Sequence, residues 1–128
     1  VVHVQDASKA VSVASKLSTI NDGVVISPNC TISPNVTLGD FTYVNFNCGI
    51  GHDANIGKFV QINPGAQIGG GVTVGECSLI GSGATILQGV KIANNATVGS
   101  GSVVFSRVKS DTTVMGNPAK RAKIFERD

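Results

Sequence analysis

The chain has 128 residues and a formal net charge of +2, which suits one domain with a modest core. Charged residues make up 14% of it, against roughly 25% in an average globular protein, and its 16 glycines exceed the usual share of about 7%. The hydrophobic content of 41% excludes a disordered tail, and the aromatic content of 5% excludes a core built on large rings. The small net charge argues against a nucleic-acid partner, and no apolar stretch reaches the roughly 20 residues that cross a membrane.

Residues 1–19 are expected to form an N-terminal lead-in segment or a partial coil. They lack the charged and apolar regions of a signal peptide. His3, in this segment, is interpreted as structural or incidental. The three cysteines of the chain are too few for a disulfide framework, which favours a reducing compartment. We therefore expect a cytoplasmic protein.

Residues 20–109 repeat with a period of six. Every sixth residue from Ile20 to Val104 is Ile, Leu or Val, and ten of the eleven isoleucines of the chain fall on this series. An α-helix would place apolar residues three and four apart, so the strict spacing excludes a helix. The inward series is Ile20, Ile26, Ile32, Leu38, Val44, Ile50, Ile56, Ile62, Ile68, Val74, Ile80, Ile86, Ile92, Val98 and Val104.

A second series lies four residues after each member of the first and contains only small or β-branched residues, from Val24 to Val108. The residue directly after the first series is often glycine, which we interpret as the position where the backbone turns. Each hexad is therefore predicted to be one short strand and one corner, with a large and a small side chain pointing inward.

This pattern resembles the hexapeptide repeat of left-handed parallel β-helix acyltransferases. The resemblance implies an all-β fold, a triangular prism of about five 18-residue coils, and a homotrimer. The coils are expected at residues 20–37, 38–55, 56–73, 74–91 and 92–109. Residues eighteen apart should then lie on the same face, one coil above the other.

The eighteen-residue period predicts which side chains stack. Cys30 and Cys48 become inward neighbours, and we favour core packing for them over a disulfide or a metal site. Cys77 is off the inward series and is expected to be a surface or interface thiol. Phe41 and Phe59 stack at an outward position, which argues for burial against another copy of the chain.

His52 is the candidate catalytic residue. It follows an inward position by two and therefore lies at a corner, with Gly70 of the segment Gly69-Gly70-Gly71 directly above it. The missing side chains predict a cleft where a ligand can approach the backbone. A neutral imidazole there can accept a proton from an attacking amine or hydroxyl near pH 7. Asp53, next in sequence, could raise its basicity if the corner geometry brings the two together.

The resemblance becomes more specific at this point and extends over nearly the whole chain. The sequence is similar to sialic acid O-acetyltransferases and bacterial amino-sugar N-acetyltransferases, which implies that His52 is the general base and that Asp53 tunes it. The implied reaction is direct transfer from acetyl-CoA to the amine or hydroxyl of an amino sugar, which we expect to be nucleotide-linked. The residues that carry the resemblance are Gly51-His52-Asp53, residues 56–66, Gly69-Gly70-Gly71-Val72 and residues 114–120.

Residues 110–128 are expected to form a C-terminal loop with an Asn-Pro-Ala-Lys motif, followed by a tail. Residues 119–127 are predicted to be a short helix or a tail that covers the open end of the coils. The motif matches the closing loop that borders the nucleotide end of coenzyme A in the family. Lys120, Arg121 and Lys123 could pair with coenzyme A phosphates, and a solvated basic C-terminus remains the alternative.

The family places coenzyme A in the groove between two prisms of the trimer. Gln61 stands where relatives often have a second His, so it can donate a hydrogen bond to the acetyl carbonyl but cannot shuttle a proton. The cofactor-binding residues implied by the resemblance are Gln61, Gly70, Ser82, Ser100, Asn117, Pro118 and Lys120.

The sequence also allows an alternative to the acetyltransferase. The chain could be a catalytically silent trimeric scaffold, or the isolated C-terminal domain of a larger sugar acetyltransferase. Family members usually carry an N-terminal sugar-binding domain, and residue 1 of this chain stands near that junction. A carbonic anhydrase on the same prism needs three His ligands for each zinc ion, and the chain has two His, so no metal site is predicted.

Overall fold

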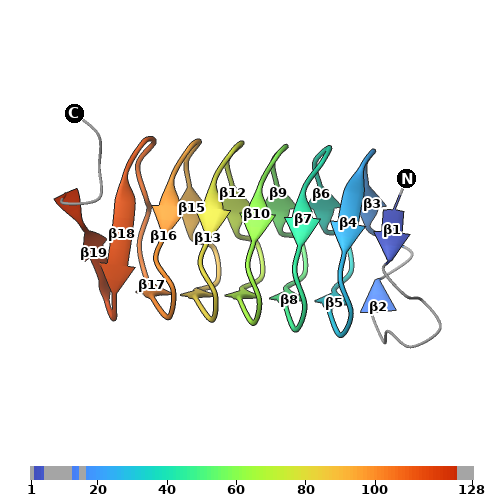
Figure 1. Cartoon of the computed structure of the whole chain (residues 1–128), viewed down its shortest axis with the longest axis horizontal. Coiled ribbons are helices and arrows are strands. Elements are labelled where there is room, and N and C mark those ends of the chain that lie inside the picture. The colour runs from blue at the N-terminus through green and yellow to red at the C-terminus, as the bar shows by residue number, and fades with distance from the viewer. Residues whose placement is uncertain (1, 5–12, 15–16, 124–128) are drawn as a thin grey trace.

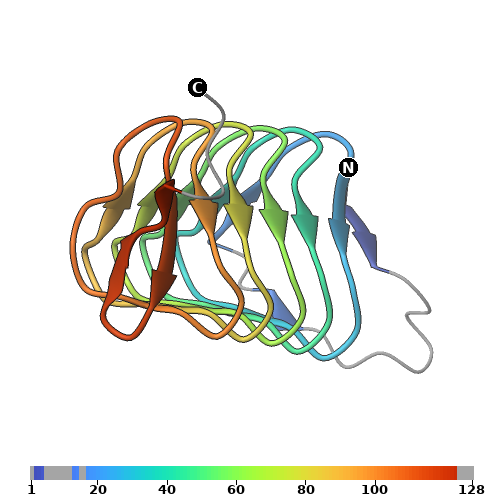
Figure 2. The same ribbon diagram turned by 60° about the vertical axis from the view of Figure 1, so that its left-hand side comes forward.

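The computed structural model describes residues 2–4, 13–14 and 17–123, which form a parallel β-solenoid of triangular cross-section (Figures 1 and 2). Sheet A contains β1 (Val2–Val4), β4 (Val24–Ile26), β7 (Tyr43–Val44), β10 (Gln61–Ile62), β13 (Leu79–Ile80), β16 (Thr97–Val98), β18 (Thr113–Gly116) and β19 (Ala119–Arg121). Sheet B contains β2 (Val13–Ala14), β5 (Thr31–Ile32), β8 (Gly49–Ile50), β11 (Gln67–Ile68), β14 (Thr85–Ile86) and β17 (Val103–Val104). Sheet C contains β3 (Thr19–Ile20), β6 (Thr37–Leu38), β9 (Asn55–Ile56), β12 (Thr73–Val74) and β15 (Lys91–Ile92).

Three corners connect the sheets, and each is named here by a residue that it carries. The Ser82 corner joins sheet A to sheet B, the His52 corner joins B to C, and the Phe59 corner joins C to A. Through the middle coils, each strand pairs in parallel with the strand eighteen residues later, as in Gln61 with Leu79. The predicted period is therefore observed, and the stacked columns that follow from it are real neighbourhoods.

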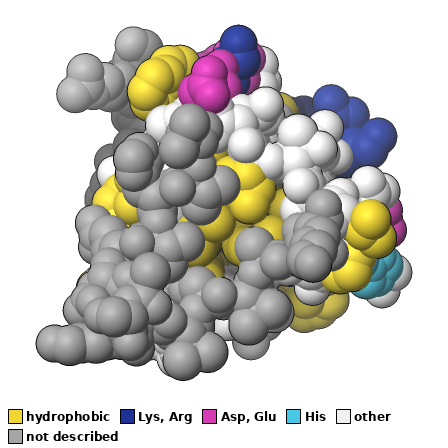
Figure 3. Space-filling view, turned by 90° about the vertical axis from the view of Figure 1, so that its right-hand side faces the viewer, with side chains coloured by type: hydrophobic (Ala, Val, Ile, Leu, Met, Phe, Trp, Pro, Cys, Tyr) yellow, Lys and Arg dark blue, Asp and Glu magenta, His cyan; other side chains and the backbone are white. Residues whose placement is uncertain are grey.

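The core consists of the two series expected from the sequence. From Ile26 to Val104 every member of the first series is buried, and every member of the second series is buried as well. Polar members of the second series are stabilised by hydrogen bonds to the backbone: Thr42 Oγ1 donates to the Gly57 carbonyl at 2.8 Å, and Ser78 Oγ to the Ala93 carbonyl at 2.9 Å. Seen from the end where the chain begins, hydrophobic side chains are visible in the middle of the molecule and at its rim, whereas the visible charged ones lie at the rim (Figure 3).

The turning residue of each hexad differs from the prediction. Residues three after the first series, from Gly23 to Asn95 and Gly101, all have φ between +54° and +76°, and most are Gly or Asn. The glycines directly after the first series have another role, since an added Cβ would lie within 3 Å of the next coil. At Gly51 that atom would be 2.6 Å from the Gly70 nitrogen. These glycines therefore allow two coils to approach closely, and they are not the point of the turn.

Both ends of the solenoid depart from the eighteen-residue period. At the start, Val2 pairs with Val24, and at the end Thr97 pairs with Thr113, so the last coil is two residues shorter. The chain then reverses through a cis Asn117–Pro118 peptide, and β19 pairs antiparallel with β18. The predicted helix is therefore wrong for residues 119–121, because they extend the edge of sheet A as a strand. Residues 124–128 lie outside the described residues.

Within the described part of the chain, no helix is long and apolar enough to cross a membrane.

Candidate active site

His52 lies at the turn between β8 and β9, with its side chain 62% exposed. The turn is fixed by its neighbours, because Asp53 has φ of 62° and its backbone nitrogen donates to the Pro34 carbonyl at 3.1 Å. The His52 carbonyl in turn accepts a hydrogen bond from the Gly71 nitrogen at 2.8 Å. Backbone hydrogen bonds to the coils below and above therefore hold the corner while the imidazole remains open to solvent.

The imidazole contacts the Asp53 carboxylate, with Nδ1 and Oδ2 3.0 Å apart. Hydrogen bonds from His52 and from the Asn35 side chain hold the pKa of the Asp53 carboxyl below its usual range. The carboxyl is therefore ionised near neutral pH and can only accept a hydrogen bond. Nδ1 of His52 must then carry the proton, which leaves Nε2 of the neutral imidazole with a free lone pair.

Nε2 faces the bare backbone of the next coil. A Cβ added at Gly70 would lie 2.6 Å from Nε2 and 2.8 Å from Cε1 of His52. Only glycine at this position leaves room for the ring. Gly69 and Gly71 extend the surface without side chains, so a ligand at Nε2 can reach the peptide groups of this segment.

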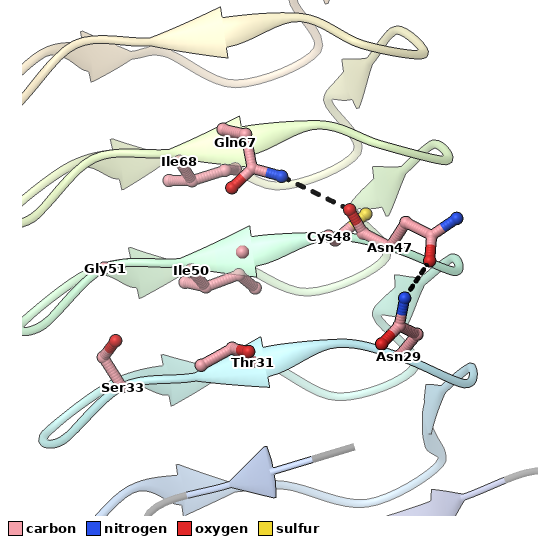
Figure 4. A pocket seen from close by; sticks show the side chains of 10 residues that line it. Asn29, Thr31, Ser33, Asn47, Cys48, Ile50, Gly51, Gln67 and Ile68 are labelled. Carbon is pink, nitrogen blue, oxygen red and sulfur yellow. Dashed lines mark hydrogen bonds between the residues drawn. The ribbon is translucent and has the colours of Figure 1, made fainter. Parts of the chain in front are cut away.

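A hollow of about 510 Å³ lies on the outer surface of sheet B, and its lining extends to Gly51, the residue before His52 (Figure 4). Its floor is Gly49, and Gln67 leans over it from the coil above, because an added Cβ at Gly49 would be 2.3 Å from Gln67 Oε1. Gly51 and Ser33 line the end next to the His52 corner. Asn29, Thr31 and Asn47 complete the polar part of the wall, Cys48, Ile50 and Ile68 contribute apolar surface, and no lining residue is charged.

The residues assigned to coenzyme A in the sequence analysis are spread over the prism. Gly70 contacts His52, whereas Gln61 is the first residue of β10 in sheet A, and Ser82 and Ser100 lie at the Ser82 corner. Asn117, Pro118 and Lys120 belong to the hairpin at the C-terminal end. A single chain thus brings together His52, Asp53 and Gly70, and leaves the other residues on separate surfaces.

The described cysteines are free thiols, with Cys30 and Cys48 buried and Cys77 exposed. Cys30 Sγ donates to the Asn45 carbonyl at 2.9 Å, and Cys48 Sγ to the Asn63 carbonyl at 3.1 Å. The hydrogen bond with Cys30 and burial raise the pKa of the Cys48 thiol, which keeps it protonated. Among the described residues, no cluster of three or more His, Cys, Asp or Glu could hold a metal ion.

Sequence reasoning missed two contributors to this region. Asn35 supports Asp53, and the eighteen-residue period could have found it, since the two positions share a column. Gln67 is not recognisable in this way, because its place over the hollow depends on the conformation of its side chain and on the absence of one at Gly49. Its Nε2 atom donates to the Asn47 carbonyl at 3.3 Å.

Comparison with protein families and solved structures supports the expected resemblance. Residues 53–88 match the family described as bacterial transferase hexapeptide (six repeats). The acetyltransferase domain of PglB from Neisseria gonorrhoeae is 30% identical, with a TM-score of 0.90 over 95% of this chain and 58% of that one. A variant of perosamine N-acetyltransferase from Caulobacter crescentus, in complex with CoA and GDP-perosamine, is 29% identical, with a TM-score of 0.86 over 87% of this chain and 53% of that one.

WeeI from Acinetobacter baumannii is 31% identical, with a TM-score of 0.76 over 88% of this chain and 58% of that one. The chain thus spans a little over half the length of these relatives. No curated protein sequence matches it. The resemblance predicted from the repeat is confirmed: residues 53–88 match the hexapeptide family, and the fold is similar to that of sugar acetyltransferases with a left-handed β-helix.

Proposed function

We propose that this protein transfers the acetyl group of acetyl-CoA to the amine of a sugar, with His52 as the general base. The observation that carries the proposal is the orientation of one imidazole, whose Nδ1 is bound to Asp53 and whose Nε2 faces the bare backbone at Gly70. The neighbours support the donor and the acceptor class, since a PglB domain is known in complex with acetyl coenzyme A and a perosamine N-acetyltransferase with CoA and GDP-perosamine.

The reaction follows from the protonation state of the site. Nε2 of His52 accepts a proton from the sugar amine as its nitrogen attacks the thioester carbonyl. The N–H groups of Gly69 and Gly71 are bonded to the Ile86 and His52 carbonyls, so the backbone N–H of Gly70 is the group that would stabilise the oxyanion of the tetrahedral intermediate. The intermediate then breaks its C–S bond, and the imidazolium returns the proton to the departing thiolate of coenzyme A. Asp53 stabilises the imidazolium between these steps.

The proposal includes a homotrimer in the cytoplasm, with coenzyme A in the groove between two prisms. Phe41 and Phe59 support association, because their rings stack with centroids 5.6 Å apart while 58% and 56% of the two side chains stay exposed in one chain. Such a patch is typical of a protein interface. Association would also bring Gln61, Ser82 and Ser100 of one copy close to His52 of another, with the C-terminal loop at Asn117, Pro118 and Lys120 beside the nucleotide end.

The test is a comparison of wild type with His52→Ala. Calorimetric titration should show coenzyme A binding to both proteins. The rate of acetyl transfer to GDP-perosamine or to glucosamine is measured by the release of free thiol. It should fall by about 10²–10⁴-fold in the variant. A Gln88→Ala variant changes the same column two coils above His52 and serves as control, with transfer expected at the wild-type rate.

A silent scaffold is the competing function. It predicts that the trimeric wild-type protein binds no coenzyme A. Equal transfer by wild type and His52→Ala would instead remove the general base from the proposal and leave binding intact.

A further inference from the structure

We propose that the hollow over Gly49 on sheet B binds the ring of the acceptor sugar, with its amine directed toward His52 and Asp53. The inference rests on the proposed function and adds the acceptor subsite to it. Three properties of the hollow carry it, namely its place beside the imidazole, the chemistry of its wall and its origin in a missing side chain.

The hollow runs along sheet B and ends at the His52 corner. Gly51, which lines its end, is the residue directly before His52. From Gly49 to His52 the chain covers three residues, at most about 10 Å, and it turns after Ile50. We infer that the substituents of a single sugar ring over Gly49 reach the imidazole. The volume of about 510 Å³ falls within the usual range of 300–1,000 Å³ for small-molecule sites.

The lining of the hollow suits a neutral, hydroxylated ring. It combines amide and hydroxyl side chains with the apolar surface of Ile50 and Ile68, and it contains no charged residue. Gln67 Nε2 is bonded to backbone carbonyls of Asn47 and Gly65, which turns Oε1 over Gly49 as an acceptor for a sugar hydroxyl. Asn29 Nδ2 donates to Asn47 Oδ1, so the two amides form one connected wall (Figure 4). Phosphate groups would find no cation there.

The one charged group near the end of the hollow favours an amine. Asp53 is ionised near neutral pH, and its side chain is 56% exposed beside His52. It attracts the ammonium form of an amino sugar, which releases one proton to solvent to become the nucleophilic amine. Nε2 of the imidazole then accepts the second proton as the amine attacks. A ring with its amine at this end thus meets the base, whereas its hydroxyls meet the amides at the other end.

The hollow exists because position 49 lacks a side chain. In the same column, Thr31 and Thr85 stand one coil below and two coils above it. Gly49 has no positive φ, and an added Cβ would meet only the movable end of Gln67. A Gly49→Thr substitution therefore fills the hollow with a residue that this face already accepts, without strain in the coil.

The experiment is saturation-transfer NMR of wild type and Gly49→Thr with GDP-perosamine and with glucosamine, and with coenzyme A as a second ligand. Asn55→Thr is the matched control, because it places Thr between Thr37 and Thr73 on sheet C. We expect sugar-ring signals in wild type and in the control, and a Kd at least tenfold higher in Gly49→Thr. Coenzyme A signals should be equal in all three proteins. Gln67→Ala should weaken sugar binding to a smaller extent.

The assignment is overturned if Gly49→Thr keeps wild-type sugar signals, or if wild type shows none with either sugar. It is also overturned if Gly49→Thr changes the mass of the assembly in sedimentation, because the hollow would then be a contact between copies of the chain. If wild type shows no coenzyme A signals, the proposed function itself is contradicted. This outcome is distinct from a failure of the sugar subsite alone.

Discussion

The His52 corner and the Phe59 corner perform the same turn with different residues. At the left-handed position, the His52 corner uses Asn35, Asp53, Gly71 and Gly89, which tolerate positive φ. The Phe59 corner has Gly23 and Asn95 in that column but places Phe41, Phe59 and Cys77 between them, where bulky residues are rare.

The two corners therefore expose different groups to their surroundings. The His52 corner removes side chains around one imidazole and so exposes backbone to a ligand. The Phe59 corner keeps two aromatic rings at a conformational cost of roughly 1–2 kcal/mol each. Stacking of the rings returns only about 0.5–1.5 kcal/mol. Such a pair is favoured when further contacts cover it, as the homotrimer proposed above would provide.

After His52→Ala, the largest effect is expected from Gly70→Ala at the His52 corner. The new Cβ would meet Nε2 and Cε1 of the imidazole and displace the ring, so acetyl transfer should fall by about 10²-fold, as for a base misplaced by about 1 Å. The measurement is steady-state kinetics with acetyl-CoA. Gly71→Ala is the control, since its Cβ has nothing within 4 Å and only its φ of +69° is strained. Equal losses in both variants would argue that backbone strain, and not the imidazole, sets the rate.

A double substitution, Phe41→Ser with Phe59→Ser, breaks the other corner. We expect the Kd for dissociation of the assembly to rise at least tenfold, because the interface loses the surface of the two rings. Sedimentation velocity measures the distribution of species. Asn95→Ser lies in the same column and should leave it unchanged. If the double variant forms the same fraction of trimer as wild type at equal protein concentration, the rings are not at the interface.

Gly39→Ala, two residues before Phe41, tests the close approach of coils. Its Cβ would lie 2.6 Å from backbone atoms of Gly57 and Lys58, which cannot move aside, so the free energy of unfolding should fall by about 1–3 kcal/mol. Urea denaturation followed by circular dichroism gives the value. Gly49→Ala should cost less, because its Cβ meets only the end of a side chain. A larger loss at Gly49 would contradict this account of the glycines.

The smallest effect is expected from Asp53→Asn. Asparagine tolerates the turn and can accept the bond from Nδ1, but it loses the charge that stabilises the imidazolium, so transfer should fall by about tenfold. The pKa of the Asp53 carboxyl is lowered in the fold. Its contribution to stability is therefore present above the unfolded value of about 3.9 and is lost as the pH falls through the folded value. The difference in Tm between wild type and variant should shrink below about pH 4; a constant difference would contradict the assignment.

The sequence predicts the core well, because burial repeats every six residues and leaves a regular signal. Stacking at eighteen residues also predicts the contact between His52 and Gly70. The role of Gly51 was mistaken, since a glycine needed for close approach and a glycine needed for positive φ look the same in a sequence. The pairing of Thr97 with Thr113 was missed because the shorter last coil does not follow the period.

The candidate site was predictable only where it depends on position in the repeat. The proton on Nδ1 follows from Asp53 and Asn35, whose side chains meet through the turn geometry. The hollow over Gly49 depends on the rotamer of Gln67, which no periodic pattern encodes.

The hairpin of β18 and β19 has a consequence for how the molecule behaves in solution. A parallel solenoid offers the unpaired strand edges of its last coil to any passing chain, and identical units could add there without limit, as in a fibril. On sheet A this edge is occupied by an antiparallel strand that carries Lys120 and Arg121. Reversed strand direction and positive charge both discourage another prism from joining, so growth into filaments is blocked along this side of the molecule.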